Sequence, residues 1–231
     1  MSGFTDVHAH FVYGVDDGAR TKAEMEAMLD AANADGITSL FATPHVMPGV
    51  HPFDRQLFHA HFREAEAYCR ERGYSMKLYT GAEILYTPVL EQYAIDHELP
   101  VFEDSNKVLL EFTPEITCRE MDYALSCLAR LGYIPVLAHI ERYSCLFTGS
   151  NAIKLKQYHN VHYQVNANTL LTGRGYFRMR KIQSWLRAGL VDYVASDAHD
   201  TQSRPFQLRK AYRLLKERYG LPAAEHLSGP K

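Results

Sequence analysis

The chain alternates short apolar or β-branched runs with longer stretches in which apolar residues recur every three or four positions. The short runs predict strands, and the longer stretches predict amphipathic helices. Seven such pairs follow one another, with strands expected at residues 5–7, 39–43, 77–81, 107–110, 134–138, 161–165 and 193–195. This alternation is typical of parallel strands joined by right-handed crossovers, and seven repeats suggest a barrel.

The helical stretches carry recognisable start and stop residues. Thr21 and Glu24 form a TxxE pattern typical of a capping box, and Gly36 is suited to end that helix. Thr117 and Glu120 repeat the pattern before another amphipathic stretch. The last helix is predicted to begin near Pro205, to end at Gly220 and to bury Leu208, Ala211, Tyr212, Leu215 and Tyr219.

Acidic and histidine residues stand at or just after the ends of the apolar runs. Nine of them are potential metal ligands: His8, His10, Asp17, His45, Glu83, Glu111, His139, Asp197 and His199. In a parallel barrel the catalytic groups gather at the carboxyl ends of the strands, because the βα loops converge there. Each residue alone is also compatible with an ion pair or a capped loop. Their joint occurrence at strand ends favours a metal-binding catalytic mouth.

Two of these pairs have the spacing of a chelating strand. Residues i and i+2 of a strand point to one side, so His8 and His10 can reach one ion. Asp197 and His199 repeat the spacing after the apolar Val194-Ala195. Imidazole with carboxylate suits a divalent ion such as Zn, Mn or Fe.

A second HxH, His59 and His61, lies in a stretch predicted to be helical, residues 54–72. Two residues at this spacing diverge by about 200° around a helix and cannot chelate one ion. We therefore expect them at the surface. The same expectation covers five further histidines: His51, His97, His159, His162 and His226.

Composition narrows the class of protein. The 231 residues are 46% hydrophobic and 23% charged with a net charge of -2, so neither a nucleic acid nor an anionic membrane surface is indicated as a partner. No apolar run approaches the roughly 20 residues that span a bilayer, and no secretion signal precedes the first motif, so we expect a cytoplasmic protein without membrane insertion. One domain is expected over residues 1–231, with a core at about 5–219 and a tail at 221–231.

The cysteines argue against a cysteine-based mechanism. Cys69, Cys118, Cys127 and Cys145 form no CxxC pair, and none has the arginine six residues later that a cysteine phosphatase loop requires. Free structural thiols of a reduced compartment are the favoured interpretation.

The motifs together carry a family resemblance. The runs DVHAHFVYGVDDGAR, ATPH, GAEI, LLEF, AHIERY, VNANTL and SDAHDTQSRP occur in this order between Asp6 and about Tyr219. They resemble the polymerase and histidinol phosphatase (PHP) superfamily, and more narrowly the bacterial capsule-type protein-tyrosine phosphatases of the CpsB and YwqE group. The resemblance implies an α/β fold, a distorted seven-stranded (β/α)7 barrel with a metal site at the carboxyl ends of the strands.

The resemblance also implies three divalent metal ions, with Mn expected and Fe or Zn as alternatives. His8, His10, Glu83 and Asp197 would hold one ion; Glu83 as a bridge, with Glu111 and His139, the second; and Asp17, His45 and His199 the third. Between the neighbouring aspartates, it favours Asp17 over Asp16. Which of Glu83 and Glu111 bridges the ions is left open.

The expected reaction is hydrolysis of a phosphate monoester, in which positioning and charge neutralisation do most of the catalysis. We hypothesise that a metal-bridging hydroxide attacks phosphorus in line, without a phospho-enzyme intermediate, while Arg142 and Arg204 bind the remaining oxygens. Either arginine is also compatible with a purely structural role. For Arg204, a cation near the start of the predicted last helix is unfavourable and invites an anionic partner.

Several features are weaker. The basic stretch at residues 173–181 is more typical of a solvated helix face than of a ligand clamp, although it could attract acidic peptide tails. Asn166 and Asn168 either line the mouth or cap a loop. Three tyrosines near the candidate ligands either stack on a phosphotyrosine ring or pack on the rim: Tyr13, Tyr86 and Tyr143.

Three function classes follow. The first is a metal-dependent protein-tyrosine phosphatase acting on the tyrosine-rich tail of a bacterial kinase that controls capsule or exopolysaccharide synthesis, an inference from the resemblance. The second is a PHP enzyme for small molecules, such as histidinol phosphate, or a PHP nuclease. The third is a non-catalytic metal-binding regulator. Asp17 and Glu111 match the tyrosine-phosphatase branch, the charge of -2 gives a nuclease no support, and a regulator should have lost ligands.

Overall fold

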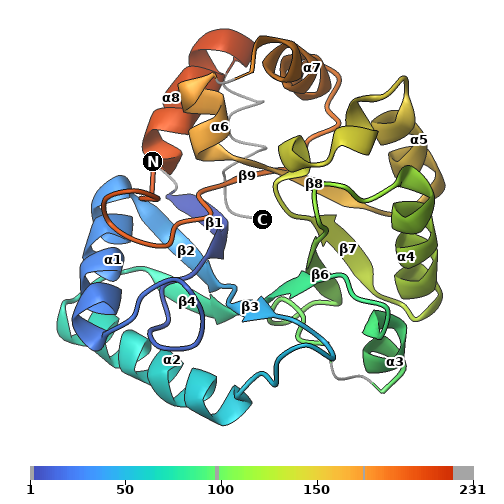
Figure 1. Ribbon diagram of the computed structural model, residues 1–231. Coiled ribbons are helices and arrows are strands. Elements are labelled where there is room, and N and C mark those ends of the chain that lie inside the picture. The colour runs from blue at the N-terminus through green and yellow to red at the C-terminus, as the bar shows by residue number, and fades with distance from the viewer. Residues whose placement is uncertain (1–2, 97–98, 174, 221–231) are drawn as a thin grey trace.

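The strands surround a centre and the helices cover the outside, in a computed structural model that describes residues 3–96, 99–173 and 175–220 (Figure 1). Each predicted strand range overlaps an observed strand. The strands are β1 (Phe4–Ala9), β2 (Ile37–Ala42), β3 (His45–Val46), β4 (Lys77–Thr80), β5 (Glu83–Leu85), β6 (Lys107–Glu111), β7 (Ile134–Leu137), β8 (His162–Asn166) and β9 (Tyr193–Ala195). The predicted tail, 221–231, lies outside the described residues.

The strands pair in parallel throughout, in two sheets. One sheet has the order β1-β2-β4 and the other the order β3-β5-β6-β7-β8-β9. The two sheets adjoin in sequence, because β3 follows β2 and β5 follows β4 after short breaks. At the other side, an isolated parallel bridge joins Ala9 to Ala198. The predicted parallel α/β fold is confirmed, but no single closed sheet of seven strands occurs among the described residues.

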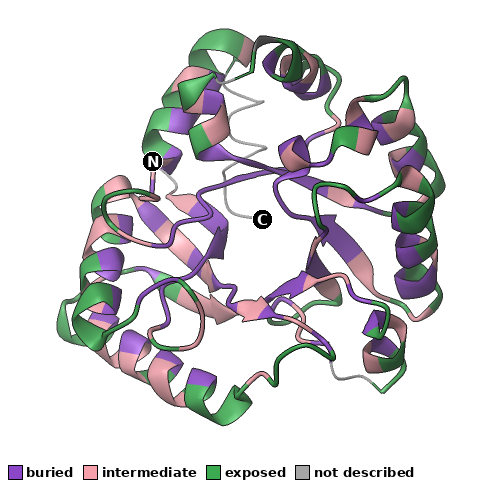
Figure 2. Cartoon of the chain, in the orientation of Figure 1, coloured by how far each residue is buried: buried purple, intermediate pink, exposed green. Residues whose placement is uncertain are grey.

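The helices connect successive strands. They are α1 (Lys22–Asp35), α2 (Arg55–Glu71), α3 (Leu90–Ile95), α4 (Cys118–Arg130), α5 (Asn151–Tyr158), α6 (Ala167–Thr172), α7 (Tyr176–Arg187) and α8 (Leu208–Tyr219), with 3-10 turns η1 (Ile140–Arg142) and η2 (Ser144–Phe147). Their outer faces are exposed, whereas the strands are largely buried (Figure 2). Within the described part of the chain, no helix is both long and apolar enough to cross a bilayer.

The predicted helix ends are largely correct. The reciprocal capping box of Thr117 and Glu120 is present at α4. At α1 only half of it forms: the Thr21 hydroxyl accepts from the Glu24 N–H, while the Glu24 carboxylate accepts from Arg20 N at 2.7 Å. The last helix begins at Leu208, three residues later than predicted. Leu208, Ala211 and Leu215 are buried as expected, but Tyr212 and Tyr219 are only partly buried.

Candidate metal centre and active site

The structure brings all nine predicted donors together at the carboxyl ends of the strands. His8 lies in β1, His10 follows β1, and Glu111 ends β6. His45 and Glu83 lie just past the carboxyl ends of β2 and β4, where the short strands β3 and β5 begin. His139, Asp197 and His199 lie in the segments that follow β7 and β9. Six of the nine are at most 4% exposed: His8, His10, Glu83, His139, Asp197 and His199. Such a concentration of buried ionisable groups requires compensating partners.

One group of donors surrounds the end of β1. His8 Nε2 lies 3.1 Å from His10 Nε2 and 3.0 Å from Glu83 Oε2. His8 Nε2 also lies 3.4 Å from Asp197 Oδ1. These four residues offer donor atoms that all lie within 4.8 Å of one another.

Glu83 connects this group to a second one. Its Oε1 lies 2.7 Å from His139 Nε2, which in turn is 3.3 Å from Glu111 Oε1. Its Oε2 faces the other way, toward His8, and also lies 3.3 Å from His45 Nδ1. His45, Glu83 and Glu111 form a group of their own by donor distance. The two carboxylate oxygens of Glu83 therefore contact different sets of histidines.

The third group includes the loop after β1. Asp17 Oδ1 lies 3.3 Å from His45 Nε2 and 3.4 Å from His199 Nε2, and His10 completes the group. Asp17 is exposed and points its carboxylate at these imidazoles. Asp16 does not join any group: its Oδ2 accepts hydrogen bonds from His10 Nδ1 at 2.7 Å and from His45 N at 3.1 Å. The sequence-based preference for Asp17 over Asp16 agrees with this geometry.

The residues fit divalent cations. Ligands bound at about 2.0–2.2 Å and set at 90–110° around one ion are about 3.0–3.5 Å apart, which is the spacing observed between these nitrogen and oxygen atoms. Three of the donor atoms are buried without a hydrogen-bond partner: His45 Nδ1, Asp197 Oδ1 and His199 Nε2. Buried lone pairs without donors are costly, and a cation would satisfy them.

Contacts with buried carboxylates favour the protonated form of two histidines in this cluster. Burial alone would lower the pKa of His10, but hydrogen bonds to Asp16 and Glu83 outweigh it and raise the pKa to about 10. Burial likewise opposes the charged form of His139, and hydrogen bonds to Glu111 and Glu83 raise its pKa to about 9. Burial would raise the pKa of Glu83, but the surrounding imidazoles hold it well below its ordinary value. Protonated imidazoles thus balance buried carboxylates.

Loading the metal-free protein with Mn²⁺ should release protons. At neutral pH His10 and His139 carry protons, because their pKa values lie at about 10 and about 9, and a metal ligand must present a free lone pair. Affinity should therefore rise with pH, by up to about tenfold per pH unit for each proton displaced. Calorimetric titration in buffers of different ionisation enthalpy measures the release. An affinity that is flat between about pH 6 and about pH 8 would contradict the protonation described here.

Three residues that the sequence did not single out as ligands position the ligands. Gln164 is fully buried, and its Oε1 contacts His8 Nδ1 at 3.2 Å and accepts from His139 N at 2.7 Å. Its amide nitrogen donates to Asn166 Oδ1, and Asn166 Nδ2 donates to Asp197 Oδ2 at 2.7 Å. Asp16 plays the corresponding role for His10. Such partners fix the tautomer and orientation of metal-binding side chains.

Replacing Gln164 by Ala should lower metal affinity by roughly 10- to 100-fold, because the acceptor that orients His8 and the His139 backbone is lost. Gln92→Ala is the matched control, since Gln92 is exposed on α3 and its side-chain amide donates to Asp96 on the same helix end. Metal retained after dialysis, measured by mass spectrometry, separates the two variants. Equal retention in both would remove Gln164 from the positioning network.

The two predicted arginines converge on one carboxylate oxygen. Arg142 Nη2 lies 3.0 Å and Arg204 Nη2 2.9 Å from Asp197 Oδ2. Arg142 Nη1 also lies 3.4 Å from Glu111 Oε1. Their side chains are 41% and 39% exposed, and both line a cavity of about 180 Å³ that reaches Asp197. Two guanidinium groups therefore border the donor set on its solvent side.

Comparison with known proteins assigns the chain to a family. Residues 4–229 match the family described as capsular polysaccharide synthesis, CpsB/CapC. The chain belongs to the CpsB/CapC family. It is 29% identical to the tyrosine-protein phosphatase CpsB of Streptococcus pneumoniae over 227 residues, covering 96% of this chain and 93% of that protein. It is also 29% identical to the tyrosine-protein phosphatase YwqE of Bacillus subtilis, covering 93% and 85% of the two chains.

Solved structures agree with this assignment. Among crystal structures of YwqE from Bacillus subtilis and CpsB from Streptococcus pneumoniae, described as metal-dependent tyrosine phosphatases, one chain superposes with a TM-score of 0.85 at 26% identity, covering 95% of this chain and 89% of that one. An organophosphorus hydrolase from Deinococcus radiodurans matches with a TM-score of 0.63 at 13% identity, which shows a shared fold only. This architecture is therefore found outside the CpsB/CapC family as well.

Backbone strain marks two donors of this CpsB/CapC site. His139 has a φ of 31° and Asp197 a φ of 55°, a region that non-glycine residues seldom adopt and that costs on the order of 1–3 kcal/mol. Hydrogen bonds hold both: His139 N donates to Gln164, and Asp197 N donates to His8 O at 2.9 Å. The strained residues are held where their side chains face the other donors.

The histidines expected at the surface differ among themselves. His59 is exposed on α2, as predicted for a helical HxH. His61 is half-buried instead: it stacks on Tyr13 at 3.7 Å, and its Nδ1 lies 2.8 Å from Tyr13 O. His159 and His162 are partly buried and pair with Asp122 and Asp192. His51 is exposed. His97 and His226 lie outside the described residues.

The basic stretch at residues 173–181 and Tyr143 make structural contacts in the fold. In the basic stretch, Arg178 donates to Glu141 O at 2.9 Å and Lys181 to Gly149 O at 3.1 Å, which ties α7 to the turns after β7. Arg174 lies outside the described residues. Tyr143 is buried, with its hydroxyl 3.4 Å from His139 Nδ1. The four cysteines are free.

Arg204 requires one correction. Because α8 begins at Leu208, Arg204 lies in the preceding turn, where its N–H donates to Asp200 Oδ1 at 3.2 Å. The prediction that Arg204 lies near the first turn of the last helix, where the helix dipole disfavours a cation, is therefore wrong. Its position near the site instead follows from this turn, whose Asp200 side chain also accepts from the N–H of Gln202 and Ser203.

Proposed function

We propose that this chain is a metal-dependent protein-tyrosine phosphatase. The observation that carries the proposal is the set of nine clustered donors flanked by two half-exposed arginines. Relatives in the CpsB/CapC family that bear the name tyrosine-protein phosphatase align over nearly the whole chain and support it. Complete ligand groups speak against a purely regulatory, non-catalytic protein.

The donors suit three divalent ions. His8, His10, Glu83 and Asp197 would hold one; Glu83, Glu111 and His139 the second; and Asp17, His45 and His199 the third. The opposed oxygens of Glu83 support its role as the bridge. His10 and His45 lie close enough to neighbouring groups to contribute to two of them. Mn, Fe and Zn all accept such ligands.

Bound metal ions would lower the pKa of water toward neutrality and neutralise phosphoryl charge. The chain's own contribution is to hold and orient the phosphate. Arg142 and Arg204 each have a guanidinium group at Asp197 and about 40% of the side chain exposed, so they can donate to phosphoryl oxygens while Asp197 keeps its bond from Asn166. Tyrosine phenolate leaves readily because the pKa of its conjugate acid is about 10.

Two finer proposals concern the fold and the partner. The seven strand positions, with β2 and β4 each continued by a second short strand and β1 bridged to the segment after β9, support a distorted seven-stranded (β/α)7 barrel. The family's description as capsular polysaccharide synthesis supports a role in that process, and the substrate that we propose there is a phosphorylated bacterial tyrosine kinase. The cytoplasmic location and the absence of a nucleic-acid partner stay predictions.

A substrate panel tests the function directly. Mn²⁺-loaded protein should hydrolyse a phosphotyrosine peptide far faster than histidinol phosphate or an oligonucleotide, as judged by kcat/KM. The same peptide with phosphoserine in place of phosphotyrosine is the comparison substrate, because it keeps the charge and the flanking sequence while it removes the ring and the phenolate leaving group. Faster turnover of histidinol phosphate or of the oligonucleotide would overturn the assignment in favour of the other PHP activities.

A further inference from the structure

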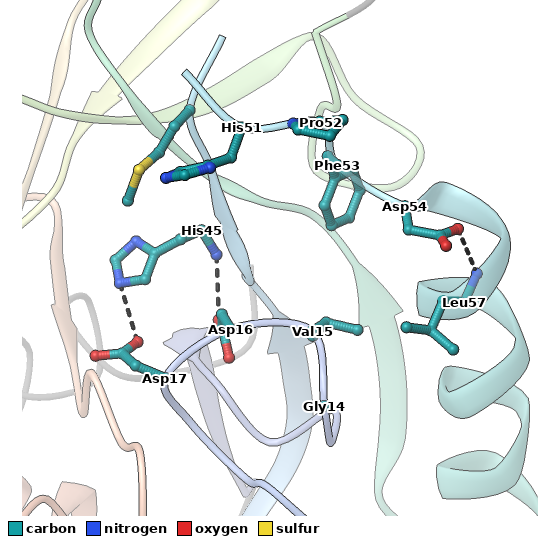
Figure 3. A pocket seen from close by; sticks show the side chains of 11 residues that line it. Gly14, Val15, Asp16, Asp17, His45, His51, Pro52, Phe53, Asp54 and Leu57 are labelled. Carbon is teal, nitrogen blue, oxygen red and sulfur yellow. Dashed lines mark hydrogen bonds and ion pairs between the residues drawn. The ribbon is translucent and has the colours of Figure 1, made fainter. Parts of the chain in front are cut away.

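A cavity of about 530 Å³ opens beside the donor set. Its walls come from the loop after β1, from the segment after β3 and from the start of α2. Five apolar side chains line it together with the carboxylates of Asp16, Asp17 and Asp54: Val15, Met47, Pro52, Phe53 and Leu57. In Figure 3, Phe53 and Val15 face each other across this space, with His45 at one end and Leu57 at the other. We call this cavity the aryl pocket.

The aryl pocket is continuous with the candidate metal centre. Asp17 and His45 line the pocket and also belong to the third donor group. No Lys or Arg occurs among the described residues that line it, whereas the two arginines line a different cavity with Asp197. A phosphate group is therefore expected at the arginines and at the cations that the donors would hold, and the apolar side chains beside them are left for the organic part of the ester.

The walls of the pocket are held in place before a ligand arrives. Phe53 packs against the buried Phe58 with ring centres 5.6 Å apart. Asp54 caps α2 by accepting from Leu57 N at 2.9 Å, which fixes the end of the pocket. The loop that carries Val15 is anchored by the stack of Tyr13 on His61. A preformed apolar slot binds a flat ring with little loss of conformational entropy.

We propose that the aryl pocket receives the phenyl ring of phosphotyrosine, with Phe53 and Val15 as the residues that determine specificity. This inference rests on the proposed phosphatase function. The ring of phosphotyrosine would lie between Phe53 and Val15 while its phosphate reaches the donors. Phosphoserine has no ring to fill the slot, and its short side chain would bring the peptide backbone against the pocket walls. Aromatic and aliphatic walls favour a ring through burial and offset stacking.

Binding and turnover of Phe53→Ala test the proposal. We expect KM for a phosphotyrosine peptide and for phenyl phosphate to rise roughly tenfold, because the lost ring contact corresponds to about one tenfold step in affinity. Binding of phenylphosphonate to the Mn²⁺-loaded protein should weaken by a similar factor, while inorganic phosphate should bind as before and metal content should stay unchanged. Phe53→Leu should restore much of the loss, because it refills the apolar wall.

Tyr158→Ala is the matched control, since Tyr158 ends α5 and is 77% exposed. It should behave as the unchanged protein in every assay. If Phe53→Ala impairs the peptide but not phenyl phosphate, a neighbouring peptide residue occupies the pocket and the proposal is overturned. Unchanged phenylphosphonate binding would overturn it as well. Phenylphosphonate binding does not depend on turnover. It therefore tests the pocket assignment even if the protein hydrolyses no phosphotyrosine peptide.

Discussion

Replacing Glu83 by Gln is expected to lower kcat/KM on a phosphotyrosine peptide by roughly a thousandfold or more, because a shared metal ligand supports several kcal/mol of charge stabilisation. Glu83 contacts His8 and His45 through one oxygen and His139 through the other. Glutamine keeps the shape but removes the negative charge that two donor groups share. Bound metal per chain should therefore fall together with activity.

Glu103→Gln is the control for Glu83→Gln. Glu103 accepts hydrogen bonds from Thr80 and belongs to none of the donor groups found among the described residues. Its variant should keep metal and activity. Metal content by mass spectrometry and thermal unfolding distinguish loss of the ions from loss of the fold. If Glu83→Gln keeps both its ions and its turnover, Glu83 is not the residue that joins the groups.

The strands were predictable because their signal is local. Most of the apolar runs are largely buried in a parallel sheet, so composition marks them, although β4 is only partly buried. The breaks between β2 and β3 and between β4 and β5 were not predictable. At the first of them, a tertiary contact accompanies the break. Thr43, between β2 and β3, turns its hydroxyl to Ala9 on the neighbouring strand, where it accepts from Ala9 N at 3.0 Å. Nothing in the local pattern distinguishes this from a continuous strand.

The donors were visible for a similar reason, since polar residues at the ends of apolar runs are conspicuous. Their positioning partners depend on contacts between distant segments: Gln164 is 156 residues from His8. One local signal was available. Gln164 lies between the fully buried Tyr163 and Val165 of β8, and a buried amide requires partners. Asp16 gave no such signal, because its role differs from that of Asp17 through its bonds to His10 and to the backbone of His45, which follow from the fold.

The aryl pocket lay beyond sequence reasoning altogether. Its walls come from separate segments, and the residues from Met47 to Phe53 show no periodicity that would place them against Val15. His51 was expected to be an ordinary surface residue. It is exposed, as predicted, yet it also lines the pocket. The function of a loop depends on the contacts that its residues make, and the rest of the fold determines those contacts.

Removing the Arg142 side chain should lower kcat by roughly 10²–10³ while the metal content stays intact, as expected when a preorganised donor to developing charge is lost. Arg142 is not a donor to the ions, and Asp197 keeps its hydrogen bond from Asn166 and its contact with Arg204. Arg204→Ala should have an effect of the same kind. Each variant should also bind inorganic phosphate more weakly.

Arg130→Ala is the control for these variants, because Arg130 lies on α4 and pairs with Glu91 away from the donors. Arg142→Lys provides a sharper test. Lysine restores the charge but not the paired N–H donors, so a recovery of only part of the rate would point to two-point binding of phosphoryl oxygens. Full turnover in Arg142→Ala would show that this guanidinium merely neutralises Asp197. If the double variant is no worse than either single one, the two arginines act as one unit on the same phosphate.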